Sequence, residues 1–108
     1  MITRIVKLEI DPANADVFRA HFDEVCVEIR NFPGCLGLEL LHDLHSNGIF
    51  FTWSRWSNEA SFETYRQSQL FNATWQKVKP LFVNKAQAWS LAIEKDLGTS
   101  ESNTIAVS

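Results

Sequence analysis

Apolar side chains recur along this chain with a period of two in some segments and with a helical period in others. Residues 3–10 alternate and present one clearly apolar face, which predicts a first strand. Residues 17–29 carry apolar side chains at helical spacing, and Asp11 or Asn14 is a suitable cap for this helix. The stop signal Phe32-Pro33-Gly34 follows, so we expect a strand, a helix and then a turn.

A second pair of alternating segments spans residues 36–43 and 50–56. The turn signal Ser46-Asn47-Gly48 lies between them, which predicts an antiparallel hairpin. In the first of these two strands, alternation places four side chains together on one side: Leu36, Leu38, Leu40 and His42.

The rest of the chain predicts more helix and a last strand. Ser57 or Asn58 is positioned to cap a helix, and a second helical stretch continues to Phe82. Residues 86–93 form the last predicted strand. The order β-α-β-β-α-β predicts an α+β fold of the ferredoxin-like type, in which helices cover one face of a four-stranded antiparallel sheet.

The second strand of the hairpin is aromatic on both faces. Phe50 and Trp56 fall on one face, and Phe51 and Trp53 fall on the other. The few helices of so short a chain cover only one face, so we expect a second copy of the chain to cover the other. The sequence therefore predicts a two-fold homodimer with Phe51, Trp53 and Trp89 near its interface.

Length and composition favour one domain, residues 1–96, followed by a polar tail, residues 97–108. The chain is 45% hydrophobic, with four Trp and eight Phe, a surplus that suits an interface or a ligand pocket. The net charge of −3 and the lack of basic runs argue against nucleic acid as a partner. Neither a membrane-spanning run nor a signal-peptide pattern occurs, which favours a cytoplasmic protein with no membrane partner.

The cysteines and histidines indicate neither a disulfide framework nor a metal site. Cys26 falls within the first predicted helix and Cys35 at the start of a strand, and the sequence names no base beside either thiol. His21, His42 and His45 are not spaced as metal ligands, so we expect no metal.

Four segments carry a resemblance to a known family. They are a Pro-Gly turn into a strand, a strand that ends in Trp, a Tyr-x-x-Ser-x-x-Phe helix and a short Lys-Pro segment, at residues 32–40, 51–56, 65–71 and 79–82. Together, over residues 2–93, they resemble the antibiotic biosynthesis monooxygenase (ABM) domain family. The resemblance implies a dimeric α+β barrel, a homodimer in which two sheets pack face to face with the helices outside.

The resemblance also implies site residues, because the family includes cofactor-free quinone-forming monooxygenases and haem-degrading enzymes. In the first group, a Trp and an Asn on the third strand and an Arg on the later helix correspond here to Trp56, Thr52 and Gln76. In the second group, the axial His and a ring-contacting Trp correspond to Trp75 and Tyr65, which leaves a haem iron without its ligand. The resemblance therefore implies a monooxygenase with no metal, flavin or haem cofactor.

Eight residues are candidates for the site. We expect Trp56 to stack on or bound the substrate, Thr52 to hydrogen-bond its oxygen, and His42 or His21 to take a proton. The residues predicted to contact a small aromatic molecule are Tyr65, Trp75, His21, Arg66 and Asn72. Each candidate also has a structural interpretation, such as packing against the sheet or pairing of Arg66 with Glu63.

Three functions remain open from sequence alone, because one fold supports many functions. The first is a monooxygenase that oxidises an aromatic or quinone-type compound with electrons from the substrate itself. The second is a non-catalytic dimer that binds a small aromatic molecule. The third is a structural dimer whose rings only pack.

Overall fold

The computed structural model describes residues 1–98, and within them the element order confirms the predicted ferredoxin-like α+β fold. The elements are β1 (Ile2–Glu9), η1 (Pro12–Asn14), α1 (Ala15–Arg30), β2 (Cys35–His42), β3 (Ile49–Trp56), α2 (Glu59–Arg66), α3 (Gln69–Val78), η2 (Lys79–Leu81) and β4 (Gln87–Leu91). Of the predicted polar tail, residues 97–108, all but the first two residues lie outside the described part of the chain.

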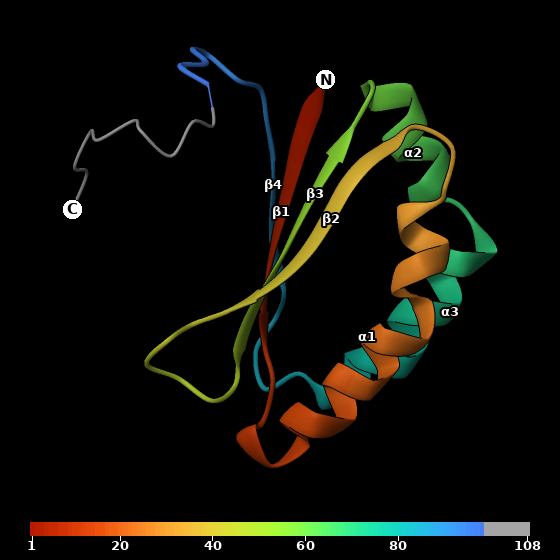
Figure 1. Ribbon diagram of the computed structural model, residues 1–108. Helices are drawn as coiled ribbons and strands as arrows, with labels where there is room; N and C mark the ends of the chain where they lie inside the picture. Colours follow the sequence, from red (N-terminus) through yellow and green to blue (C-terminus); the bar gives the residue numbers. More distant parts are fainter. Residues whose placement is uncertain (99–108) are drawn as a thin grey trace.

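The strands form one antiparallel sheet in the order β2-β3-β1-β4. The predicted hairpin is present as the pair of β2 and β3. Figure 1 shows α1, α2 and α3 gathered on one side of the sheet, and within residues 1–98 no helix lies over the other side. The sheet therefore has a helix-covered face and an open face.

The register of the strands decides which face each side chain occupies. Ile5 of β1 pairs with Trp53 of β3 and with Trp89 of β4, so these three side chains form a row on one face. Thr52 and Trp56 belong to the opposite, helix-covered face, because they alternate with Trp53 along β3. Trp53 is 37% exposed and Trp89 is 44% exposed, which is consistent with an open face that residues 1–98 leave uncovered.

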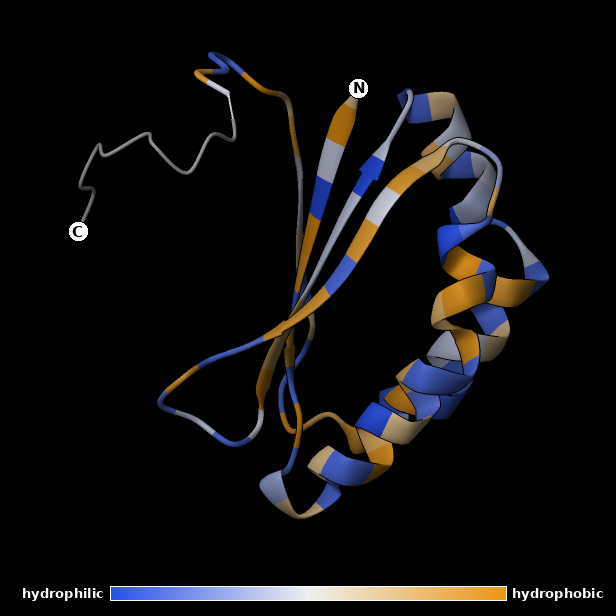
Figure 2. Ribbon diagram, viewed as in Figure 1, coloured by the Kyte–Doolittle hydropathy of each residue, from blue (hydrophilic) through white to orange (hydrophobic). Residues whose placement is uncertain are grey.

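Two hydrophobic clusters fill the space between the sheet and the helices. In the first, Phe18 of α1 meets Phe50 of β3 with ring centroids 4.8 Å apart. The second surrounds Trp56 and includes Phe62 and Tyr65 of α2. Figure 2 shows hydrophobic and hydrophilic positions interleaved along each helix, the pattern of amphipathic helices that bury one side. None of the helices in residues 1–98 is long and apolar enough to cross a membrane.

A β-bulge at the start of β2 changes the predicted face of one residue. The register shifts between Cys35 and Gly37, so that Cys35 pairs with Trp56 and Leu36 is the extra residue. Leu36 is 47% exposed, whereas Cys35 is buried. The predicted grouping of Leu36 with Leu38 was therefore wrong, because strict alternation holds only where no residue is inserted.

Side-chain caps start two of the helices, and a glycine forms the turn that leads into β2. Asn58 caps α2 by accepting from the Ser61 amide at 2.8 Å, and Ser68 caps α3 by accepting from the Phe71 amide at 3.1 Å. Ser68 thus separates α2 from α3, the two helical segments that the sequence predicts. Gly34, in the turn before β2, has a φ of 89°, and a Cβ at this position would collide with Ser61.

Candidate functional site

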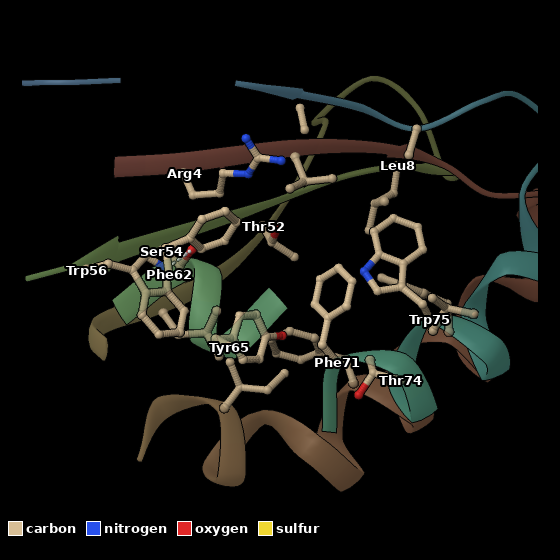
Figure 3. Close-up of a pocket in the computed structure, with 18 residues that line it drawn as sticks. Arg4, Leu8, Thr52, Ser54, Trp56, Phe62, Tyr65, Phe71, Thr74 and Trp75 are labelled. Carbon is tan, nitrogen blue, oxygen red and sulfur yellow. Dashed lines mark hydrogen bonds between the residues drawn. The ribbon is translucent and has the colours of Figure 1, made fainter. Parts of the chain in front are cut away.

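A cavity of about 230 Å³ lies between the helix-covered face of the sheet and the helices. It is larger than the cavity of ~150 Å³ that accepts benzene, so it has room for one or two aromatic rings. Figure 3 shows the residues of its lining as sticks. They are Arg4, Val6, Leu8, Phe18, Phe22, Ile29, Leu38, Thr52, Ser54, Trp56, Phe62, Tyr65, Phe71, Thr74, Trp75, Val78, Ala86 and Ala88.

A continuous series of rings lines the cavity. Tyr65 stacks on Trp56 with centroids 4.9 Å apart, and Phe71 packs edge-on against Tyr65 at 5.3 Å. Trp75 continues the series 5.7 Å from Phe71, and Figure 3 shows its indole nitrogen directed into the cavity. Such a wall presents ring faces and edges to a flat apolar ligand.

Trp56 forms the closed end of the cavity. It lies at the end of β3 and is 0% exposed, and its indole Nε1 donates a hydrogen bond to Ser54 Oγ at 3.0 Å. Phe62 packs against the indole at 5.7 Å. A side chain enclosed in this way bounds the cavity, whereas Phe71 and Trp75 are only partly buried and keep surface for a ligand.

The hydroxyl of Tyr65 stays protonated at neutral pH. Burial raises the pKa of Tyr65 above its ordinary value, and the nearby Cys35 raises this pKa further. A neutral phenol donates or accepts a hydrogen bond but does not act as a base. Tyr65 can therefore hold a ligand oxygen without removing a proton from it.

Arg4 of β1 and Thr52 of β3 line the cavity from the sheet (Figure 3). Arg4 Nη1 donates to Ser90 Oγ at 2.9 Å, and the guanidinium carbon lies 4.9 Å from the centroid of the Phe62 ring. Burial and, to a smaller degree, the charge of Arg66 lower the pKa of Arg4. Arginine remains protonated in proteins despite such a shift, so Arg4 brings a positive charge to the lining.

Within residues 1–98, the lining contains no carboxylate, imidazole, thiol or lysine side chain. Its polar side chains carry hydroxyl, indole N–H or guanidinium groups, and all of these donate hydrogen bonds. In the same part of the chain, no cluster of His, Cys, Asp or Glu is arranged to hold a metal ion. The cavity can therefore bind an electron-rich oxygen, but its described lining offers no ordinary general base.

Four of the eight predicted site residues line the cavity, namely Thr52, Trp56, Tyr65 and Trp75. His42 does not, although it pairs with Phe50 and so belongs to the helix-covered face. It is exposed at the last position of β2, next to the hairpin loop, and its Nδ1 lies 3.2 Å from the carbonyl oxygen of Asp43. The end of the strand extends beyond the cavity.

The other three predicted residues also lie outside the lining. Arg66 forms an ion pair with Glu63 at 3.3 Å, the alternative that their spacing suggested. Asn72 is exposed on α3, as is Gln76, the position that corresponds to the family's Arg. His21 is partly buried on α1, and its Nδ1 has no hydrogen-bond partner among the described residues.

Arg4 is not among the predicted site residues, although a sequence signal for it exists. Arg4 alternates with Val6 and Leu8 on the helix-covered face of β1. A charged residue on an otherwise apolar strand face requires a partner or a function. This departure from the apolar pattern identifies Arg4 as a candidate site residue.

Comparison with known proteins identifies relatives. The family model for antibiotic biosynthesis monooxygenase (ABM) matches residues 1–77. A structure from Caulobacter crescentus that carries the same family name is 21% identical, with a TM-score of 0.80, and the match covers 86% of this chain and 90% of that one. Another such structure, from Deinococcus radiodurans, is 18% identical, with a TM-score of 0.83 and coverage of 93% and 99%. At these identities the likeness shows the fold, and no functionally curated protein matches the sequence.

Proposed function

Because the chain belongs to the antibiotic biosynthesis monooxygenase family, we propose that it is a cofactor-independent monooxygenase for a small aromatic or quinone-type molecule. The observation that carries this proposal is the cavity, which combines a wall of rings with polar groups from the sheet. Its volume of about 230 Å³ suits one or two rings better than an extended polycyclic compound. The substrate class is therefore a phenol of that size.

The proposed reaction converts a phenol and dioxygen into a quinone and water. The phenolate donates an electron to dioxygen, the radical pair forms a C–O bond at a ring carbon, and loss of water leaves the quinone. One oxygen atom enters the ring and the other leaves as water. All four electrons that reduce dioxygen come from the substrate, so no external reductant is consumed.

The cavity residues have defined roles in this reaction. Thr52 donates a hydrogen bond to the phenolic oxygen, which stabilises the anion that reduces dioxygen. The rings of Phe71 and Trp75 hold the plane of the substrate, and Trp56 closes the end of the cavity. Tyr65, as a neutral hydroxyl, supplies a second donor.

A second candidate function is binding of the same ligand class without turnover. It is favoured by the lack of a carboxylate or imidazole in the described lining, because a phenol must lose its proton before it can reduce dioxygen. In an enzyme built in this way, ionisation takes place in solution or through water. In a binding protein, no such step is needed.

Oxygen uptake separates the two functions. Purified protein, verified to be free of metal, flavin and haem, is mixed with 1-naphthol, and dioxygen and 1,4-naphthoquinone are measured together. Turnover predicts saturable uptake of one dioxygen per quinone, reduced in Thr52→Val. Uptake at the rate of a protein-free control, together with calorimetric binding of 1-naphthol, would instead establish the binding function.

We also propose that two copies of the chain pair through the open face of the sheet. Ile5, Trp53 and Trp89 form an apolar row there, and a monomer seldom leaves such a patch to water. Light scattering at micromolar concentration should report a dimer, and Trp53→Asp should dissociate it by burying an unpaired charge. Val27→Asp, on α1 and 66% exposed, is the matched control and should leave the mass unchanged. A monomeric wild-type protein would overturn this proposal.

A further inference from the structure

Arg4 carries a positive charge that no carboxylate of the described residues directly pairs with. Within residues 1–98, the ion pairs join other residues, and no carboxylate oxygen lies within 4.0 Å of the Arg4 nitrogens. Its Nε is buried and has no hydrogen-bond partner in the same part of the chain. Its Nη1 donates to Ser90, which is neutral.

The surroundings of Arg4 compensate this charge only in part. The ring of Phe62 lies against the guanidinium at 4.9 Å, and the cross-strand neighbours of Arg4 are Ser54 and Ser90. Arg66 adds charge of the same sign, which lowers the pKa of Arg4, and the carboxylate of Glu63, which is paired with Arg66, offsets this effect in part. A partly buried cation among rings and hydroxyls costs free energy unless an anion is bound beside it.

We propose that Arg4 recognises the charge of the ligand, and that the cavity selects an aromatic molecule that bears a negatively charged oxygen group. The inference rests on the cavity being the ligand site proposed above, and it adds which group of the ligand is bound and where. The charged group lies beside Arg4, on the side of the cavity formed by β1 and β4. The ring of the ligand then extends toward Phe71 and Trp75.

The chemistry of the guanidinium suits this role. Its N–H groups lie in one plane and form charge-assisted hydrogen bonds with a carboxylate or a phenolate. Arg4 Nη1 donates one hydrogen bond to Ser90 Oγ, and this bond holds the guanidinium in place. The other N–H groups of Arg4 remain available to a ligand.

The rest of the lining also favours an anionic ligand. Thr52, Tyr65 and Trp75 all present donors, and the described lining contains no carboxylate that would repel an anion. A cationic ligand would meet a like charge, and a neutral ligand would leave Arg4 without an anion beside it. A ligand that enters already ionised also suits a cavity whose described lining lacks a base.

A pair of ligands with the same shape tests the inference. 1-Naphthoate and 1-naphthamide share their rings and differ in charge at one group, and calorimetry measures both affinities. We expect the wild type to bind 1-naphthoate about 10- to 100-fold more tightly, the effect of a charge-assisted hydrogen bond. Arg4→Gln should remove this preference, whereas Arg4→Lys should retain part of it because it keeps the charge.

A second measurement distinguishes the two possible oxygen groups. The visible absorbance of 4-nitrophenol reports its ionisation, so its pKa can be followed in the bound state. A lower pKa when it is bound to the wild type, and not when it is bound to Arg4→Gln, assigns a phenolate to Arg4. If the wild type prefers 1-naphthoate to 1-naphthamide but does not lower the pKa of bound 4-nitrophenol, the group bound by Arg4 is a carboxylate.

The outcomes separate this inference from the proposed function. Equal wild-type affinities for 1-naphthoate and 1-naphthamide would overturn the role of Arg4 and leave the cavity as a ligand site. Failure of 1-naphthoate, 1-naphthamide and 1-naphthol all to bind would overturn both proposals. A preference that persists in Arg4→Gln with an unchanged circular dichroism spectrum would assign the charge recognition to another residue. The wild-type comparison stands even if Arg4→Gln does not fold.

Discussion

Trp56 and Tyr65 stack with their ring centroids 4.9 Å apart and their planes inclined by 23°, which joins the end of β3 to α2. Trp56 has no exposed surface, and its indole N–H is bonded to Ser54. The same pair of rings therefore belongs to the hydrophobic core and to the cavity wall. Substitutions here change stability as well as ligand contact, and the two effects must be measured separately.

The first prediction concerns this stack. Trp56→Ala should lower the free energy of unfolding by about 3–5 kcal/mol, because it leaves a void and removes the donor bonded to Ser54. Urea unfolding at a fixed protein concentration measures the change. Leu44→Ala, in the hairpin loop and 83% exposed, is the control and should change the free energy by no more than about 0.5 kcal/mol. A loss of less than about 1 kcal/mol in Trp56→Ala would contradict the buried stack.

The second prediction uses the fact that Tyr65 is the single tyrosine of the chain, so tyrosinate absorbance reports this residue alone. Burial raises the pKa of Tyr65 above its ordinary value of 10.0. The folded protein should therefore develop tyrosinate absorbance at a higher pH than the urea-unfolded chain. Coincident titration curves would show that the ring is not shielded from water.

The same shift should make the protein less stable in alkali. Above pH 10.0 the unfolded chain releases the Tyr65 proton while the folded protein keeps it. The folded state then binds more protons, so the free energy of unfolding falls as pH rises, by up to about 1.4 kcal/mol per pH unit. Tyr65→Phe lacks this proton and should lose stability less steeply over the same range. Parallel curves for the two proteins would refute the assignment.

Most of the fold follows from local signals in the sequence. Alternation, caps and turn residues predicted every strand and the hairpin, because these patterns reflect backbone geometry that is decided within a few residues. Leu36 was misplaced for a physical reason, since the β-bulge beside it depends on how β2 pairs with β3 rather than on β2 alone. Pairing between strands is set by tertiary contacts that alternation does not encode.

The site was predictable in part. Thr52 and Trp56 could be assigned to one face because they alternate along a strand, and both line the cavity. His42 belongs to the same face but lies at the end of its strand, where the cavity does not reach. Alternation identifies a face, whereas the extent of a cavity depends on where the helices lie. Arg4 could have been found as a charge on an apolar face, without any knowledge of the cavity.

The third prediction compares Thr52 with the position that corresponds to the family's Arg. Thr52→Val keeps the shape of the side chain and removes its hydroxyl, so 1-naphthol should bind about 2- to 10-fold more weakly, the effect of one neutral hydrogen bond. Gln76→Arg should leave this affinity unchanged, because Gln76 is exposed on α3 and outside the cavity lining. Calorimetry with 1-naphthol measures both. Tighter binding by Gln76→Arg would show that position 76 contributes to the ligand site after all.

The last prediction closes the cavity without removing any of its polar groups. Ala88 of β4 pairs with Val6, lines the cavity and is exposed, so it lies at the opening. Ala88→Phe should fill this opening and weaken the binding of 1-naphthoate by at least about tenfold, because the new ring occupies the ligand's volume.

The stability of Ala88→Phe should change by about 1 kcal/mol or less, because an exposed position accepts a larger side chain with little strain. Ala73→Phe makes the same change at an exposed site on α3 outside the lining, and it should bind 1-naphthoate as the wild type does. If Ala88→Phe also binds as tightly as the wild type, the ligand binds elsewhere. In that case the cavity is only a packing defect beneath the helices, and the structural interpretation of its rings is the correct one.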